Sequence, residues 1–178
     1  MTTEKFVKSI SSLKPIKDEL EGIKYPSGLI NTWLNEFDII EIFNKYNGDN
    51  PIISLISNYD VSSLKINDIT FDSNYFDDGE HFCFGWDATG DRIAIYKPNG
   101  KIIAYDVYGD RITFECAENS EKFLDALVEI MKFVREKILN NYDEKARDKR
   151  SKEVAYIASL KAGGAEYEDY YKSVLWVE

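Results

Sequence analysis

Residues 81–116 alternate apolar and polar side chains with a period of two, and glycines interrupt the alternation at nearly regular intervals. The glycines that interrupt it are Gly90, Gly100 and Gly109. Each stands at the fourth position of a turn, where glycine adopts the left-handed conformation without steric cost. Asp87 and Asp106 stand at the first position of two turns, where a carboxylate accepts backbone N–H bonds. The spacing predicts four antiparallel strands joined as a β-meander.

The phrase D-x-x-G-D-R-I occurs twice in this segment, at residues 87–93 and again at residues 106–112. A duplicated calcium loop is one interpretation of the repeat. It requires glycine where Arg92 stands and a closing glutamate where Pro98 stands. The repeat is therefore interpreted as turn structure, and we expect no metal site.

Apolar residues at helical spacing predict helices on both sides of the meander. The expected helical segments are 2–14, 16–21, 27–48, 119–141 and a charged, later amphipathic helix beginning near 143. In the third of these, an apolar stripe runs through Phe37, Ile40 and Phe43 to a stop at Asn47-Gly48. Residues 51–76 fit either a strand or a short helical turn.

These segments predict the α+β class: an antiparallel β-meander sheet flanked by N-terminal helices and a long C-terminal helix, with a further helical tail. We expect one domain over residues 1–142. Residues 143–178 are expected to form a helical extension packed on the same domain.

The net charge of −10 is unevenly distributed along the chain. Residues 36–118 contain sixteen acidic residues and six basic ones, whereas the flanking segments are nearly neutral. This distribution disfavours nucleic acid as a partner, because phosphate binding needs a basic surface. It favours a basic protein partner, since opposite charges accelerate encounter and select the docking surface. The alternative is that the acidity serves solubility.

The sequence contains no motif of nucleophilic, phosphate-binding or metalloprotease chemistry. His81 is the single histidine, and Cys83 follows it at the spacing that places both on one face of a strand. A buried histidine at the start of a strand explains this pair better than a nucleophile and its base. We therefore expect a non-catalytic protein without a cofactor. A small-ligand site between the meander and the helices, with His81 and Cys83 near its mouth, is the less favoured alternative.

Acidic and aromatic residues occur together in and before the meander, which is typical of the centre and rim of a protein interface. The candidate partner-binding residues are Asp77, Asp78, Glu80, Trp86, Asp87 and Asp91. For Trp86, interface and core positions are equally favoured. Tyr105 alternates with Ile103 and Val107, which favours the core.

No stretch approaches the run of about 20 apolar residues that a membrane helix needs. The N-terminal residues spread charges among their apolar positions, unlike a secretion signal. The two cysteines, Cys83 and Cys116, cannot form a disulfide framework. A cytoplasmic location is expected, with no membrane partner.

The order of these elements resembles the SMI1/KNR4 (SUKH) superfamily. The residues that carry the resemblance are Tyr25-Pro26, which lead into the helix that ends FNKYNG (43–48), then FDDGEHFCFGWDATGDRIAIY (76–96), NGKIIAYD (99–106) and NSEKFLDALVEIM (119–131). Together the similar segments span about residues 23–135. The resemblance implies an α+β fold.

For function, the resemblance implies an immunity protein that binds and neutralises a cognate bacterial toxin, often one that acts on nucleic acid. Fungal members of the superfamily imply the alternative of a regulatory scaffold with an endogenous partner.

Overall fold

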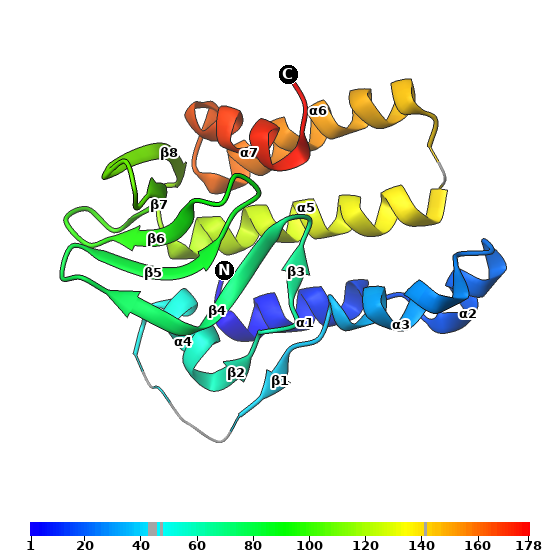
Figure 1. Cartoon of the computed structure of the whole chain (residues 1–178), viewed down its shortest axis with the longest axis horizontal. Coiled ribbons are helices and arrows are strands. Elements are labelled where there is room, and N and C mark those ends of the chain that lie inside the picture. The colour runs from blue at the N-terminus through cyan, green and yellow to red at the C-terminus, as the bar shows by residue number, and fades with distance from the viewer. Residues whose placement is uncertain (43–45, 47, 141) are drawn as a thin grey trace.

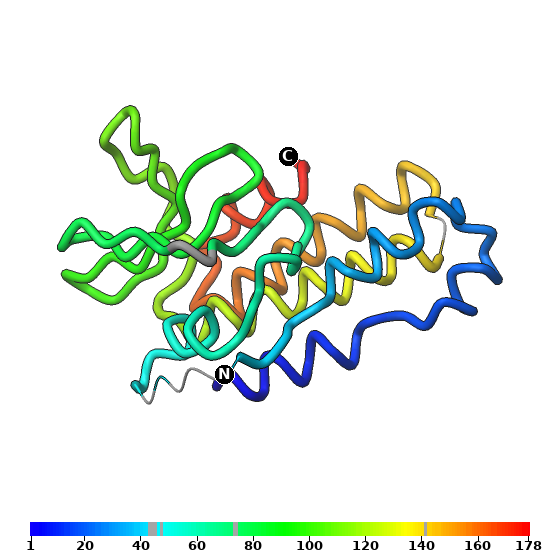
Figure 2. The backbone as a smooth tube through the Cα atoms, turned by 60° about the horizontal axis from the view of Figure 1, so that its bottom comes forward, coloured from blue at the N-terminus to red at the C-terminus, as the bar shows by residue number. Residues whose placement is uncertain are grey.

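The computed structural model describes residues 1–42, 46, 48–140 and 142–178, except for the side chains of residues 73 and 74. It confirms the α+β class, because an antiparallel sheet lies at one end of the molecule and long helices extend away from it (Figure 1). In the view of Figure 2, the N-terminal helix and the two long C-terminal helices run along one another.

The larger sheet has six antiparallel strands in the order of the sequence. They are β3 (Lys65–Ile66), β4 (Ile69–Asp77), β5 (His81–Trp86), β6 (Arg92–Tyr96), β7 (Lys101–Asp106) and β8 (Arg111–Ala117). Strands β5 to β8 confirm the expected meander, and β3 and β4 extend it at one edge. A second sheet pairs two short strands, β1 (Ile40–Glu41) and β2 (Tyr59–Asp60).

The turns of the meander follow the expected chemistry at two positions and differ at the third. Gly90 and Gly100 have φ of 87° and 76°, the left-handed conformation that glycine tolerates. In the last turn the left-handed residue is Asp110, with φ of 48°, and not Gly109. The cause is the register: Arg111 pairs with Asp106, so Asp110 occupies the last loop position, as Gly100 does in the preceding turn.

The side chains of each strand alternate between the two faces of the sheet. On β7, the side chains that face the main core differ from the expected ones. Ile102 and Ala104 face the main core, whereas Ile103 and Tyr105 belong to a separate cluster on the opposite face. Tyr105 therefore packs, partly buried, on this second and smaller cluster with Ile103, and not in the main core. The sequence KIIAYD is apolar at consecutive positions, so alternation alone could not identify the inward face.

The first two expected helices are confirmed as α1 (Thr3–Leu13) and α2 (Lys17–Gly22), but the third is shorter than predicted. Helix α3 (Ser27–Asn35) ends because the next residues form tighter turns, in which Phe37 N–H bonds to the Leu34 carbonyl. These turns place Phe37 in the core, with its ring centroid 5.2 Å from that of Trp33. Ile40 then lies on β1; Phe43 and Asn47 fall outside the described residues.

The ambiguous segment 51–76 begins as a helix, α4 (Pro51–Asn58). The Asn50 side-chain oxygen caps it by accepting from the N–H groups of Ile52 and Ile53, and Pro51 occupies the first helical position. Residues from 59 onward form β2, β3 and β4.

The C-terminal half forms the long helices α5 (Ser120–Asn140) and α6 (Glu144–Ala162), a short 3₁₀ turn η1 (Ala165–Tyr167) and α7 (Glu168–Leu175). Helices α6 and α7 contribute buried side chains to the same core cluster as α5 and the sheet. Tyr171 of α7 is fully buried, and its hydroxyl donates to the Cys116 carbonyl of β8 at 3.0 Å. Within the described ranges, no helix combines the length and apolar character needed to cross a bilayer.

Candidate functional site

One face of the large sheet packs on the helices, and the other carries a layer of its own side chains, here called the open face. Its buried floor consists of Cys83, Ala94 and Ile103. Strand pairing places the other residues of the open face: Phe76 pairs with Cys83, Trp86 with Thr70 and Arg92, and Tyr105 with Arg92 and Ile112. In the described part of the chain, all members of this floor cluster and the rings on it belong to strands.

Aromatic rings cover the floor of the open face. The His81 ring stacks on Tyr105 at 4.3 Å and on Tyr96 at 5.5 Å between centroids. The small side chains of Cys83 and Ala94 leave room for rings to lie over them. The histidine is 8% exposed, as expected for a buried histidine at a strand start.

Carboxylates at both sides fix these rings. Asp78 accepts from the His81 and Glu80 N–H groups and lies 3.0 Å from His81 Nδ1. These hydrogen bonds, led by the one from the His81 backbone, lower the pKa of Asp78 to about 2. On the other side Tyr105 donates its hydroxyl to Asp110, and this hydrogen bond raises the pKa of Tyr105 to about 12.

The Asp78 contacts predict a specific dependence of stability on pH. Because the folded pKa of about 2 lies below the ordinary value of 3.8, the carboxylate stabilises the fold above pH 3.8, and this contribution disappears as the pH falls toward 2. The Asp78→Asn variant should melt at a lower temperature than the wild type at neutral pH, and the difference should vanish near pH 2. Thermal melts between pH 2 and 7 measure it, with the exposed Asp49→Asn as control. A difference that persists at pH 2 would contradict this role of Asp78.

Trp86 is held in place at the other end of β5. Its indole Nε1 donates to Asp72 at 3.1 Å, and the Arg92 guanidinium carbon lies 3.6 Å from the ring centroid. Arg92 also pairs with Asp72, so the three side chains form one unit. The indole remains 37% exposed. A rigid, partly exposed tryptophan can bind a partner with little loss of side-chain entropy.

The open face also exposes large apolar groups. Phe76 is 55% exposed and Ile112 is 44% exposed, on β4 and β8 respectively. Together with Trp86 they span the face across strands β4 to β8. Apolar groups gathered on one face in this way are typical of binding surfaces.

The six candidate residues from the sequence do not form one cluster. Asp77, Asp78 and Glu80 lie before β5, whereas Asp87 and Asp91 lie after it, with Trp86 between the two groups. Asp77 pairs with Lys97 at 2.5 Å, and Asp78 is engaged with His81.

The assignment of Asp87 to a contact surface was wrong. Asp87 is 6% exposed, and its Oδ1 accepts from the N–H groups of Thr89 and Asp91 and from the Thr89 hydroxyl. Burial follows from its role as the cap of the β5–β6 turn. Asp91 is partly exposed, and its Oδ2 accepts from the Thr113 hydroxyl at 2.6 Å.

Much of the acidic excess between residues 36 and 118 is paired locally. Arg92, Lys97, Lys101 and Arg111 pair with acids within the segment, while Lys14 and Lys122 reach in from outside it. The acidic field is therefore weaker than the sequence count suggests. Among the described residues of the meander and its turns, Glu80, Asp91 and Asp110 lie beyond 4.0 Å of any basic side chain, so their charges are not paired.

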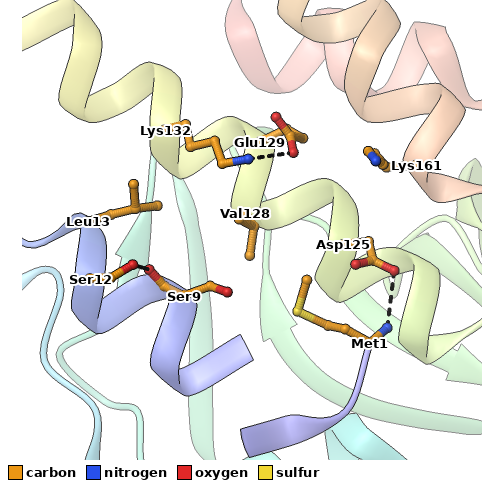
Figure 3. Close-up of a pocket in the computed structure, with 9 residues that line it drawn as sticks. All are labelled: Met1, Ser9, Ser12, Leu13, Asp125, Val128, Glu129, Lys132 and Lys161. Atoms are coloured by element: carbon orange, nitrogen blue, oxygen red, sulfur yellow. Dashed lines mark hydrogen bonds and ion pairs between the residues drawn. The ribbon is translucent and has the colours of Figure 1, made fainter. Parts of the chain in front are cut away.

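The alternative small-ligand site at His81 and Cys83 gains little from the structure. Cys83 is 2% exposed, and burial raises the pKa of its thiol, which disfavours the reactive thiolate. A hollow of about 240 Å³ between α1, α5 and α6 lies elsewhere (Figure 3). Inside it Lys132 bonds to Glu129 at 2.8 Å, so these charges already satisfy each other.

Three features of the open face escaped sequence reasoning: the Trp86–Arg92–Asp72 unit, the outward position of Ile112 and the burial of Asp87. Arg92 and Asp72 are 20 residues apart, and their pairing depends on the β4–β5–β6 register. The repeated aspartate-to-glycine turn could have indicated that Asp87 is a cap.

Comparison of the chain with protein-family models, with curated proteins and with solved structures gave no match. The resemblance to the SMI1/KNR4 superfamily accordingly stays an expectation.

Proposed function

We propose that this chain is a non-catalytic binding protein that docks a basic protein on the open face. Following the resemblance, the partner we propose is a cognate bacterial toxin that acts on nucleic acid, which the chain neutralises by stoichiometric binding as an immunity protein. The observation that supports this most is the exposure of Phe76, Trp86 and Ile112 on one sheet face.

The composition of the face suits a protein partner better than a small molecule. Aromatic anchors at the centre of an interface provide most of its affinity, and polar residues at the rim exclude water. Here the anchors lie on a sheet whose floor is buried and whose rings are fixed by hydrogen bonds. Such a surface needs little reordering on binding.

The charge at the rim favours a basic partner. Glu80 and Asp110 lie at turns next to the aromatic layer and have no basic side chain within 4.0 Å among the described residues. The toxin surface that binds nucleic-acid phosphates would be attracted to these carboxylates. When this chain covers that surface, the toxin can no longer bind its substrate. The attraction should act mainly on the rate of association.

The first experiment identifies the partner by affinity capture from the native host, followed by an activity assay of the captured protein. Recovery of a nucleic-acid-acting toxin whose activity falls to zero at an equimolar ratio supports the proposal. Recovery of an endogenous, non-toxic regulatory protein would replace it by the scaffold alternative.

The charge argument is tested on the captured complex. Glu80→Lys should reduce the association rate about tenfold at low salt, because it reverses an exposed rim charge. The reduction should shrink as salt screens the charges, since the screening length is about 8 Å at physiological ionic strength. Glu41→Lys, an exposed charge change on β1, is the matched control. Equal association rates for both variants would contradict docking at this rim.

A further inference from the structure

A hollow of about 260 Å³ lies where α5, α6, the β3–β4 turn and the end of α7 meet. It lies apart from the open face, and its lining comes from none of the strands β5 to β8. The residues that line it are Asn67, Phe133, Lys137, Arg147, Asp148, Ser151, Leu175 and Trp176.

Two cations face this hollow without an acidic partner. Lys137 of α5 is partly buried, and its ammonium contacts the Asn67 side-chain oxygen at 3.4 Å and lies 5.8 Å from the Phe133 ring centroid. Arg147 of α6 also lines the hollow and is exposed. Among the described residues, no carboxylate lies within 4.0 Å of either cation. Burial, followed by repulsion from Arg147, lowers the pKa of Lys137, so the ammonium is under-solvated where it stands.

The two carboxylates nearest the hollow either bond to other side chains or are exposed to solvent. Asp68 accepts from the Trp176 indole at 3.0 Å and lies 3.4 Å from Lys65. Asp148 lines the hollow but is exposed. Asp68 acts on Lys137 only from beyond 4.0 Å, so an anion between Lys137 and Arg147 would give both cations a direct partner.

The hollow also offers a planar apolar surface. Trp176 is 68% exposed, and its bond to Asp68 fixes the indole beside the hollow. Phe133, which is buried, contributes a second ring to the lining. Asn67, held by its bond to the Val174 carbonyl at 2.7 Å, keeps the β3–β4 turn against α7.

We infer that this hollow is a binding site for a small oxyanion carried on a planar ring, with Lys137 and Arg147 holding the anion and Trp176 contacting the ring. The cations act as charge-assisted hydrogen-bond donors, which are the stronger kind. The size of the hollow limits the ligand to a single ring with one acidic group.

The inference is tested by calorimetric titration of the full chain with phenyl phosphate, inorganic phosphate, benzoate and phenol. Phenyl phosphate or benzoate should bind with a dissociation constant of about 1 mM, as expected for so small a ligand. Phenol, which has the ring without the anion, should show no binding. The better of the two ring-bearing anions, phenyl phosphate and benzoate, tells whether phosphate or carboxylate is the preferred group. Inorganic phosphate, which lacks the ring, should bind more weakly than phenyl phosphate, and equal or tighter binding would overturn the role given to Trp176.

Lys137→Gln should weaken the binding at least tenfold, whereas Lys149→Gln, which removes an exposed charge from α6, should leave it unchanged. A second measurement does not depend on the folding of the variant: bound phenyl phosphate should protect Lys137, but not Lys149, from acylation detected by mass spectrometry. Absence of binding by both phenyl phosphate and benzoate, or acylation of Lys137 at the same rate with and without phenyl phosphate, would overturn the inference.

Discussion

Replacing Tyr171 with alanine is expected to destabilise the protein by about 3–5 kcal/mol, the usual cost of deleting a fully buried aromatic ring. The Tyr171 ring packs against Tyr170 with centroids 5.1 Å apart, and its hydroxyl donates to the Cys116 carbonyl. Alanine would leave a cavity between α7 and the sheet and an unsatisfied carbonyl at the end of β8. A loss of this size is comparable to much of the stability of an ordinary domain.

Two control variants show how much of the stability loss comes from the buried ring. One keeps the ring and removes the hydroxyl, and the other removes a tyrosine that is not buried. Tyr171→Phe keeps the ring and should cost about 1 kcal/mol, the typical net value of one hydrogen bond. Tyr156→Ala changes a half-exposed tyrosine of α6 and should cost far less than Tyr171→Ala. Urea unfolding of the three variants measures the differences. Equal stability of Tyr171→Ala and Tyr156→Ala would show that α7 contributes little to the core.

The same contacts bear on the expected division of the chain at residue 142. Helix α6 contributes Val154, Ala155, Ala158 and Ala162 to the main core, and α7 contributes both tyrosines, Val174 and Leu175. The extension over residues 143–178 thus shares one hydrophobic core with the rest of the chain. A dispensable tail would have an exposed or separate apolar face.

The sequence predicted the elements whose causes are local. The meander follows from turn residues and two-residue alternation, both of which act over fewer than ten residues. The long helix α5 follows from its continuous apolar face, and α6 ends at Gly163, whose φ of 135° suits glycine. These elements need no knowledge of distant contacts.

The sequence did not predict the features of the fold that depend on long-range contacts. Helix α3 carries a stripe that continues past Asn35, but Phe37 packs with Trp33 and the following chain pairs with β2. Bulges in the β7–β8 pair rotate Ile112 to the open face, away from the core. Neither the early end of α3 nor the outward position of Ile112 is indicated by the residues around it.

Two of the candidate residues lie at the open face. Trp86 lies on it, and Asp78 contacts His81 at the other end of β5, because a turn and its strand stay adjacent in any register. The sequence could not distinguish an exposed aspartate from a buried cap, so Asp87 was misplaced. The local pairing of acids with lysines and arginines also depends on the register, and it reduces the field that a count of charges implies.

Trp86→Ala is expected to weaken binding of the proposed partner by about 2–4 kcal/mol, or roughly 30- to 1,000-fold. The indole is the largest partly exposed ring on the open face, and Asp72 and Arg92 hold it in one orientation. Its loss removes contact area and leaves Arg92 without the ring beneath its guanidinium. Because the anchor is rigid before binding, the loss should appear mainly as faster dissociation.

Trp86→Phe should lie between the wild type and Trp86→Ala, since it keeps an aromatic ring but loses the Nε1 bond to Asp72. Trp176→Ala removes a more exposed tryptophan at the end of α7, beside a hollow that no residue of β5 to β8 lines, and should not change affinity. Circular dichroism confirms that each variant is folded before surface plasmon resonance measures its dissociation rate. If Trp86→Ala dissociates as slowly as Trp176→Ala, the partner docks elsewhere than on the open face, and exposure of Phe76 and Ile112 there needs another explanation.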